Sequence, residues 1–177
     1  MRYAFCCLAL AAFAPAMHAD LIFQATLTGL GENPPVASPA TGFISVDLHN
    51  DGITLDVNET FSGLTAPATA AHIHCCAGQG TNASVVINFV GVGFPVGSTS
   101  GTFTHTFDLN TDLTGGITLA AFLTGLESGT AYANIHDAPH PGGEIRGQLV
   151  QAVPEPSTLL LLGSGLVAVA FLRRRRG

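Results

Sequence analysis

The sequence predicts an all-β fold, a single Greek-key-like antiparallel β-sandwich with one short helix, flanked by two apolar terminal helices. Three observations predict this class. Eight short runs of alternating apolar and polar residues recur about ten residues apart. Turn-forming Gly, Pro and Asn separate these runs, and one segment has helical spacing. The 21 glycines and 10 prolines are unlike a coiled coil, and 47% hydrophobic residues are unlike a disordered chain.

The expected strands share the alternation of a sheet with one buried face. The run at 42–48 is the clearest, because Ile44 and Val46 alternate with Ser45 and Asp47, and the Asn-Asp-Gly that follows signals a hairpin turn. Eight strands are expected, at 21–27, 42–48, 53–61, 71–74, 85–89, 102–109, 132–136 and 144–150.

Residues 117–126 depart from this alternation. Leu119, Phe122, Leu123 and Leu126 stand three or four positions apart, which is the spacing of one face of a helix. We therefore expect one short helix between the last strands.

The first 19 residues are typical of a secretory signal peptide. Arg2 precedes an apolar run, and small residues follow it up to Ala19. Cleavage after Ala19 fits best because strand-like alternation begins at Leu21, and cleavage after Ala16 is the alternative. The Sec machinery and signal peptidase are the partners that this segment predicts.

The last 25 residues, 153–177, form a second apolar segment. The apolar run 159–172 is 14 residues long, short of the ~20 that comfortably span a bilayer. Arg173 to Arg176 should stay in the cytoplasm. A permanent transmembrane anchor is one interpretation.

The second interpretation is a sorting signal. Val-Pro-Glu-Pro-Ser-Thr, which contains Pro154, Glu155 and Pro156, followed by the apolar run and the arginines, strongly resembles the PEP-CTERM sorting signal. The resemblance implies a Gram-negative exporter with a transient inner-membrane intermediate. An exosortase would cut near Pro154 to Pro156 and pass the domain to the cell surface or exterior. Such proteins are associated with extracellular polysaccharide and biofilm matrix.

The middle segment, 20–152, has the length of one domain and is strongly acidic. It carries eleven carboxylates and one cation, Arg146, so its formal charge is −10. Nucleic acid is excluded as a partner, because phosphate neutralisation needs a basic face. The expected organisation is a signal peptide at 1–19, a β-sandwich at 20–152 and a sorting segment at 153–177.

An internal repeat links two parts of this domain. The Gly-Leu pair at 63–64 leads to Ala-His-Ile-His at 71–74, and the Gly-Leu pair at 125–126 leads to Ala-Asn-Ile-His at 133–136. If both are strands, Ile73 and Ile135 point into the core while the histidines face the other way. A repeated packing solution between a loop and a strand is the simplest interpretation.

Three motifs together resemble a known family. They are Glu-x-Pro-Pro-Val at 32–36, Ala-His-Ile-His at 71–74, and Asn-Ile-His followed by Gly-Gly-Glu-Ile-Arg-Gly-Gln-Leu between 134 and 149. Their order and spacing are similar to those of the CHRD domain, first named from chordin. The resemblance implies an extracellular β-sandwich and supplies no catalytic residue set. The architecture that we expect for this sandwich is immunoglobulin-like or superoxide-dismutase-like.

His72 and His74 are the candidate metal ligands, because two residues apart on a strand share one face. The repeat adds His136 as a third imidazole. Copper or zinc would suit such a site. Structural, hydrogen-bonded histidines are the alternative interpretation.

Cys75 and Cys76 follow directly and are the thiols that remain after signal cleavage. In an oxidising compartment they either close a vicinal disulfide, remain free, or ligate a soft metal together with His74.

Arg146 should be paired, because it is one cation among eleven acids. Glu144 lies on the same expected strand face, and Asn134 comes beside it from the preceding strand. We expect these three residues to form a structural polar network.

No nucleophile or acid–base pair is specified by spacing. The leading hypothesis is a non-enzymatic, surface-sorted module that binds matrix polysaccharide or protein. The competing hypothesis is an extracellular metal-binding redox protein built on His72, His74 and His136.

Overall fold

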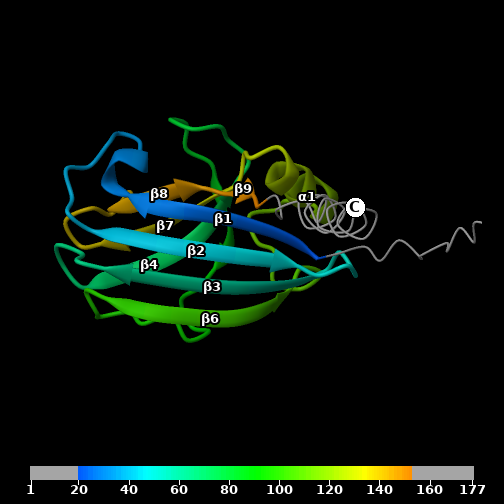
Figure 1. The fold of residues 1–177 in the computed structure, drawn as a ribbon, viewed down its shortest axis with the longest axis horizontal. Helices are drawn as coiled ribbons and strands as arrows, with labels where there is room; N and C mark the ends of the chain where they lie inside the picture. Colours follow the sequence, from blue (N-terminus) through cyan, green and yellow to red (C-terminus); the bar gives the residue numbers. More distant parts are fainter. Residues whose placement is uncertain (1–19, 153–177) are drawn as a thin grey trace, which may run out of the picture.

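The computed structural model describes residues 20–152, which form nine β-strands, one α-helix and one short 3₁₀ turn (Figure 1). The signal peptide expected at 1–19, and the sorting segment expected at 153–177 with its apolar helix, lie outside the described residues. Within 20–152, no helix is long and apolar enough to cross a membrane.

The strands match the expected runs in number and place, except that the last run divides in two. They are β1 (Leu21–Thr28), β2 (Thr41–Leu48), β3 (Thr54–Ser62), β4 (Ala68–Cys75), β5 (Ser84–Asn88), β6 (Gly101–Asp108), β7 (Tyr132–Asp137), β8 (Ile145–Gln148) and β9 (Val150–Gln151).

All the strands belong to one curled antiparallel sheet in the order β5-β4-β7-β8-β1-β2-β3-β6, with β9 paired to β1. Figure 1 shows β1, β2, β3 and β6 side by side in front, with β4, β7 and β8 behind them. The two halves are joined where Thr28 pairs with Arg146 and where β1 pairs with β9. The predicted all-β class with one short helix is confirmed, with two halves of one sheet in place of two separate sheets.

The core fills the inside of this curl. Phe89 anchors a group of aromatic rings, with the ring of Phe103 at 4.8 Å and that of Phe107 at 5.8 Å between centroids. Such offset stacks add to the stabilisation that apolar burial provides. The inward residues come from both halves of the sheet, so the core holds the halves together.

Helix α1 (Leu119–Glu127) is the short helix that the spacing predicted, and it lies at one end of the sheet (Figure 1). It begins where the hydroxyl of Thr118 accepts a hydrogen bond from the backbone N–H of Ala121, a side-chain cap of the kind that stabilises helix starts by ~1 kcal/mol. Phe122 and Leu126 are fully buried, and they fix the helix against the core.

The repeat becomes a pair of neighbouring strands. In the antiparallel register of β4 and β7, His72 lies directly opposite Asn134, and Asn134 in turn lies opposite Arg146 of β8. The two Gly-Leu segments are not equivalent, since the first is in the loop before β4 and the second is in α1. The repeat therefore places His72 and Asn134, with Arg146 beside them, in a polar row across the outer face of β4, β7 and β8.

Candidate functional site

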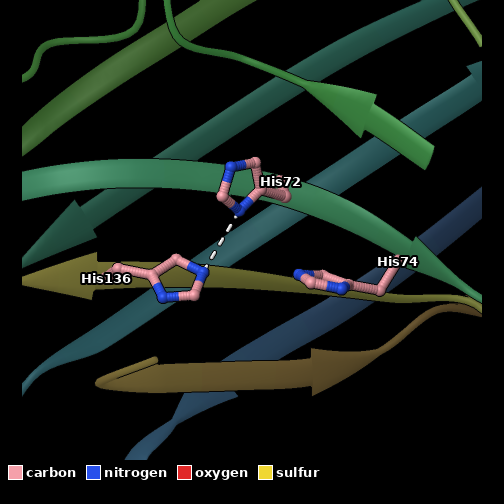
Figure 2. A group of neighbouring side chains, drawn as sticks. All are labelled: His72, His74 and His136. Carbon is pink, nitrogen blue, oxygen red and sulfur yellow. Dashed lines mark hydrogen bonds between the residues drawn. The ribbon is translucent and has the colours of Figure 1, made fainter. Parts of the chain in front are cut away.

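Three histidines meet on the outer face of β4 and β7. Ile73 and Ile135 are fully buried in the core, so His72, His74 and His136 point away from it. One imidazole nitrogen of each residue lies within 4.8 Å of those of the other two. Figure 2 shows the rings of His72 and His136 turned toward each other, with Nδ1 and Nε2 3.1 Å apart.

Two backbone carbonyls fix the tautomers of two of these rings. Nδ1 of His74 is 2.9 Å from the carbonyl oxygen of Ala83, and Nδ1 of His136 is 3.0 Å from that of Pro141. Because a carbonyl oxygen can only accept, each Nδ1 must carry the proton. Each Nε2 of a neutral ring is therefore a bare lone pair directed into the cluster.

Asn134 lies between the two lone pairs. Its Oδ1 atom is 3.0 Å from Nε2 of His74 and 3.0 Å from Nε2 of His136. The side chain is 2% exposed, so water does not compete for these contacts. Asn134 thus adds an oxygen atom to the three nitrogen donors.

Burial keeps the three imidazoles neutral. Desolvation, reinforced by the neighbouring His136 and His74, lowers the pKa of His72 to about 4. Desolvation also lowers the pKa of His74 and of His136, although hydrogen bonds to Ala83 and Pro141 oppose it. Neutral imidazole is the form that binds transition metals.

Arg146 is buried on the same face at 2% exposure, but it does not pair with Glu144 as expected. Its Nη1 donates to Oδ1 of Asn82 at 3.0 Å, and its Nη2 donates to the carbonyl oxygen of Thr81 at 2.8 Å. Within residues 20–152 no carboxylate lies within ion-pair distance of it. The guanidinium instead rests on the ring of Tyr132.

The partners of Arg146 belong to a loop that the sequence did not mark. This covering loop (residues 76–83) folds over the outer face of β7 and β8. Gln148 donates from Nε2 to the carbonyl oxygen of Ala77, and the backbone N–H of Ala83 donates to the Tyr132 hydroxyl. The loop buries Arg146 and places the Ala83 carbonyl beside His74.

Glu144 takes part in a different hydrogen-bond network, near the end of β7. Its carboxylate accepts from the Ser38 hydroxyl at 2.5 Å and from the backbone N–H of Thr65 at 2.9 Å. Nearby, Asp137 accepts from the Thr65 hydroxyl and from His140. Both carboxyl groups are fully buried, so this cluster ties three loops to the end of β7. Asp137, Ser38 and Thr65 were missed in the sequence, where nothing links positions so far apart.

Glu32, from the Glu-x-Pro-Pro-Val motif, is packed against Asn134. Gly143 makes this approach possible, because a Cβ at that position would overlap the Glu32 carboxylate and crowd Nδ2 of Asn134. Burial raises the pKa of Glu32 to about 7, while Arg146 and the hydrogen bond from Asn134 act in the opposite direction.

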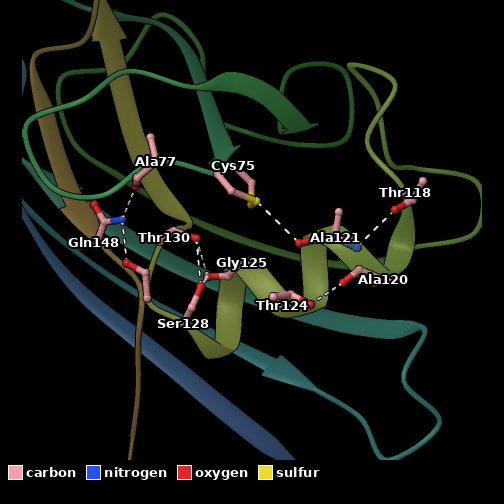
Figure 3. The surroundings of a disulfide bond; sticks show 12 residues. Cys75, Ala77, Thr118, Ala120, Ala121, Thr124, Gly125, Ser128, Thr130 and Gln148 are labelled. Carbon is pink, nitrogen blue, oxygen red and sulfur yellow. Dashed lines mark hydrogen bonds between the residues drawn. A yellow bond between two sulfur atoms is a disulfide. The ribbon is translucent and has the colours of Figure 1, made fainter.

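Cys75 and Cys76 are joined in a vicinal disulfide that lies against helix α1 (Figure 3). Cys75 is buried and Cys76 is exposed. A Cβ added at Gly125 would overlap both sulfur atoms, so only a glycine there leaves room for the bond. Because both sulfur atoms are bonded to each other and lie against α1, they are not among the candidate metal-ligand atoms of the histidine cluster.

The opposite half of the sheet carries an uncharged row on its outer face. Thr26, Phe43, Thr60 and Thr102 are successive register partners across β1, β2, β3 and β6. Phe43 is 43% exposed. A hollow of about 460 Å³ lies along this threonine row. Gln24, Ser45, Asn58 and Thr104 form a second uncharged row beside it.

Comparison with protein families gives two matches. The model of the CHRD domain matches residues 23–149, and that of the PEP-CTERM protein-sorting motif matches residues 152–176. Neither the curated proteins nor the solved structures give a match. The two family matches cover the described domain and the segment that follows it.

Proposed function

Because the chain belongs to the CHRD domain family, we propose that its exported domain is a non-enzymatic module that binds polysaccharide of the extracellular matrix. The PEP-CTERM motif directs the protein, through exosortase processing, to the surface or exterior of a bacterial cell. In the proposal this cell is Gram-negative, and the C-terminal segment anchors the protein transiently in the inner membrane after the Sec machinery and signal peptidase have acted.

The threonine row is the observation that carries the binding function. An exposed aromatic ring offers an apolar face for the C–H groups of a sugar, and hydroxyls beside it exchange hydrogen bonds with sugar hydroxyls. Phe43 lies between Thr26 and Thr60 in this arrangement, on a face that other strands leave open.

Charge narrows the class of polysaccharide. The domain carries eleven carboxylates and one cation, and that cation, Arg146, is buried on the other half of the sheet. An anionic polymer would be repelled at low ionic strength. We therefore propose an uncharged polysaccharide, and not an anionic one, as the partner.

The test is retention of the purified exported protein on neutral matrix polysaccharide. Phe43→Ala should weaken retention at least tenfold, while Ile22→Ala, which changes an exposed apolar side chain at the other end of the same face, should not. Both variants should melt as the wild type does. Equal retention of wild type and Phe43→Ala would reject the proposed surface.

Metal binding is the second candidate function, and the convergence of His72, His74 and His136 favours it. Copper and zinc are the candidates because both accept imidazole. The first test is the metal content of the exported protein. A stoichiometric metal that disappears in His72→Ala would support this function, and metal-free protein that takes up neither ion would reject it.

A further inference from the structure

The donor atoms of the histidine cluster carry more lone pairs than protons. Oδ1 of Asn134 lies 3.0 Å from Nε2 of His74 and 3.0 Å from Nε2 of His136 with no hydrogen between them, because the carbonyls of Ala83 and Pro141 hold the imidazole protons on Nδ1. Lone pairs directed at one another at this distance repel. A cation placed among them turns the repulsion into attraction.

The spacing of these atoms also fits a cation. Bonds of about 2.0–2.1 Å to zinc at tetrahedral angles hold neighbouring donors about 3.3 Å apart. Asn134 Oδ1 is 3.0 Å from two nitrogens, and His72 Nδ1 is 3.1 Å from His136 Nε2. These three spacings are close to the tetrahedral value, and each pair of imidazole donors lies within 4.8 Å, so the four donors can close around one ion by small side-chain movements.

The surroundings have the features of a metal site's outer shell. Imidazole ligands in proteins usually donate their second N–H to a carbonyl or carboxylate, which fixes the ring, and Ala83 and Pro141 serve in this way here. Glu32 lies beside the amide nitrogen of Asn134, an arrangement that favours the nitrogen turned outward and Oδ1 turned toward the rings.

We propose that His72, His74, His136 and Asn134 Oδ1 form a closed, four-coordinate N₃O site for a zinc-type divalent cation. This inference rests on the second candidate function, and it adds the fourth ligand and the metal class. Four protein donors leave no open position for water or substrate, which is the mark of a structural site and not a catalytic one. Calcium and magnesium are excluded as occupants because they require oxygen donors.

A competing arrangement uses the same atoms without a metal. If the amide of Asn134 is reversed, its nitrogen donates to both Nε2 atoms and its oxygen turns toward Glu32. The cluster is then a closed hydrogen-bond network, and no cation enters it.

The experiment is a zinc titration of the full exported chain by calorimetry, repeated with cobalt(II) as an optical probe. The proposal expects one zinc per chain, no heat with calcium or magnesium, and the intense visible bands of four-coordinate cobalt. Asn134→Ala should weaken zinc binding at least tenfold and dim the cobalt bands, since water molecules that enter the space left by the amide would raise cobalt above four-coordination. Asn58→Ala, on the other half of the sheet, is the matched control.

Asn134→Asp is a second variant, which keeps the test valid if Asn134→Ala does not fold. It keeps an oxygen donor in place, so it should bind zinc as tightly as the wild type or more tightly, with the same cobalt bands. Zinc binding that requires His72 but is unchanged, with the same cobalt bands, in Asn134→Ala would overturn the four-ligand site and leave the metal function standing. No zinc binding by the wild-type chain would reject the four-ligand zinc site, and failure to take up copper as well would reject the metal function.

Discussion

The guanidinium carbon of Arg146 lies 3.3 Å from the centroid of the Tyr132 ring, and the ring of His74 stacks on the same tyrosine at 4.6 Å. A buried cation that rests on an aromatic face is held by the ring quadrupole. The hydrogen bonds to Thr81 and Asn82 hold it from the other side. Arg146 thus fastens the covering loop to the sheet.

Arg146→Ala should be severely destabilising. It removes two charge-assisted hydrogen bonds, each worth about 1.5–3 kcal/mol, and the packing of the buried guanidinium on the Tyr132 ring. We expect the free energy of unfolding to fall by roughly 3–5 kcal/mol, measured by urea denaturation. Arg146→Lys, which keeps the charge but loses the planar fork, should recover less than half of this loss.

Thr69→Ala, at an exposed position of β4, is the control and should cost less than about 1 kcal/mol. If Arg146→Ala unfolds at the wild-type midpoint but no longer binds matrix polysaccharide, the arginine is a recognition residue and its structural role is refuted.

Glu59 should make the protein less stable as pH rises. Its side chain is fully buried in the core, and neither carboxyl oxygen has a hydrogen-bond partner in the described part of the chain. Burial raises its pKa from 4.5 to about 8. The folded state therefore keeps a proton that the unfolded state releases, so stability declines between about pH 4.5 and pH 8 and is level above that.

Glu59→Leu should raise the melting temperature and flatten this decline, because it replaces an unpaired carboxyl group by an apolar side chain of similar size. A gain of at least about 1 kcal/mol at pH 7.5 is expected, measured by thermal melts from pH 5 to pH 9. The raised pKa of Glu32 also makes stability decline as pH rises, and this contribution is the same in both proteins. The difference in melting temperature between wild type and Glu59→Leu therefore reports on Glu59 alone. A lower melting temperature at every pH would show that the core needs the carboxyl group.

The mature protein should lack Arg173 to Arg176. An exosortase that cuts near Pro154 to Pro156 removes everything beyond that point, and the family match places the sorting motif at residues 152–176. Intact-mass spectrometry of protein from the native host measures this directly, with an exosortase-deficient strain as control. Recovery of only full-length chains from a host with a working exosortase would indicate a permanent anchor.

Much of the fold was predictable because local patterns determine it. Period-two alternation located the strands, and helical spacing located α1. The same alternation also predicts that Glu59 is buried, because it follows Leu55 and Val57 at every second position of the strand and so points inward with them. The repeat drew attention to His72, Asn134 and His136, and the strands that carry them, β4 and β7, pair side by side in the structure.

The covering loop and the partners of Arg146 could not be predicted in this way. Asn82 and Arg146 are 64 positions apart, and Thr65 and Glu144 are 79 apart. Such contacts depend on how whole loops pack, and no local period encodes them. The sequence indicated that Arg146 needed partners, but it could not distinguish a carboxylate from a carbonyl and an aromatic ring.

Gly125→Ala tests the packing of the disulfide on helix α1. In an exposed helix this change would stabilise the protein, because alanine is the better helix former by ~1 kcal/mol. Here the new methyl group would overlap the sulfur atoms of both Cys75 and Cys76. Overpacking of this kind costs about 1–3 kcal/mol, so we expect a net loss of stability and a disulfide that is reduced more readily.

Thermal melts and a thiol titration under graded dithiol reductant measure the two effects. Gly78→Ala is the matched control, since a Cβ there meets open space, and it should leave both readouts unchanged. If Gly125→Ala instead raises the melting temperature and leaves reduction unaltered, the helix does not pack on the sulfur atoms. The close approach of α1 to the end of β4 would then have no role in holding the disulfide.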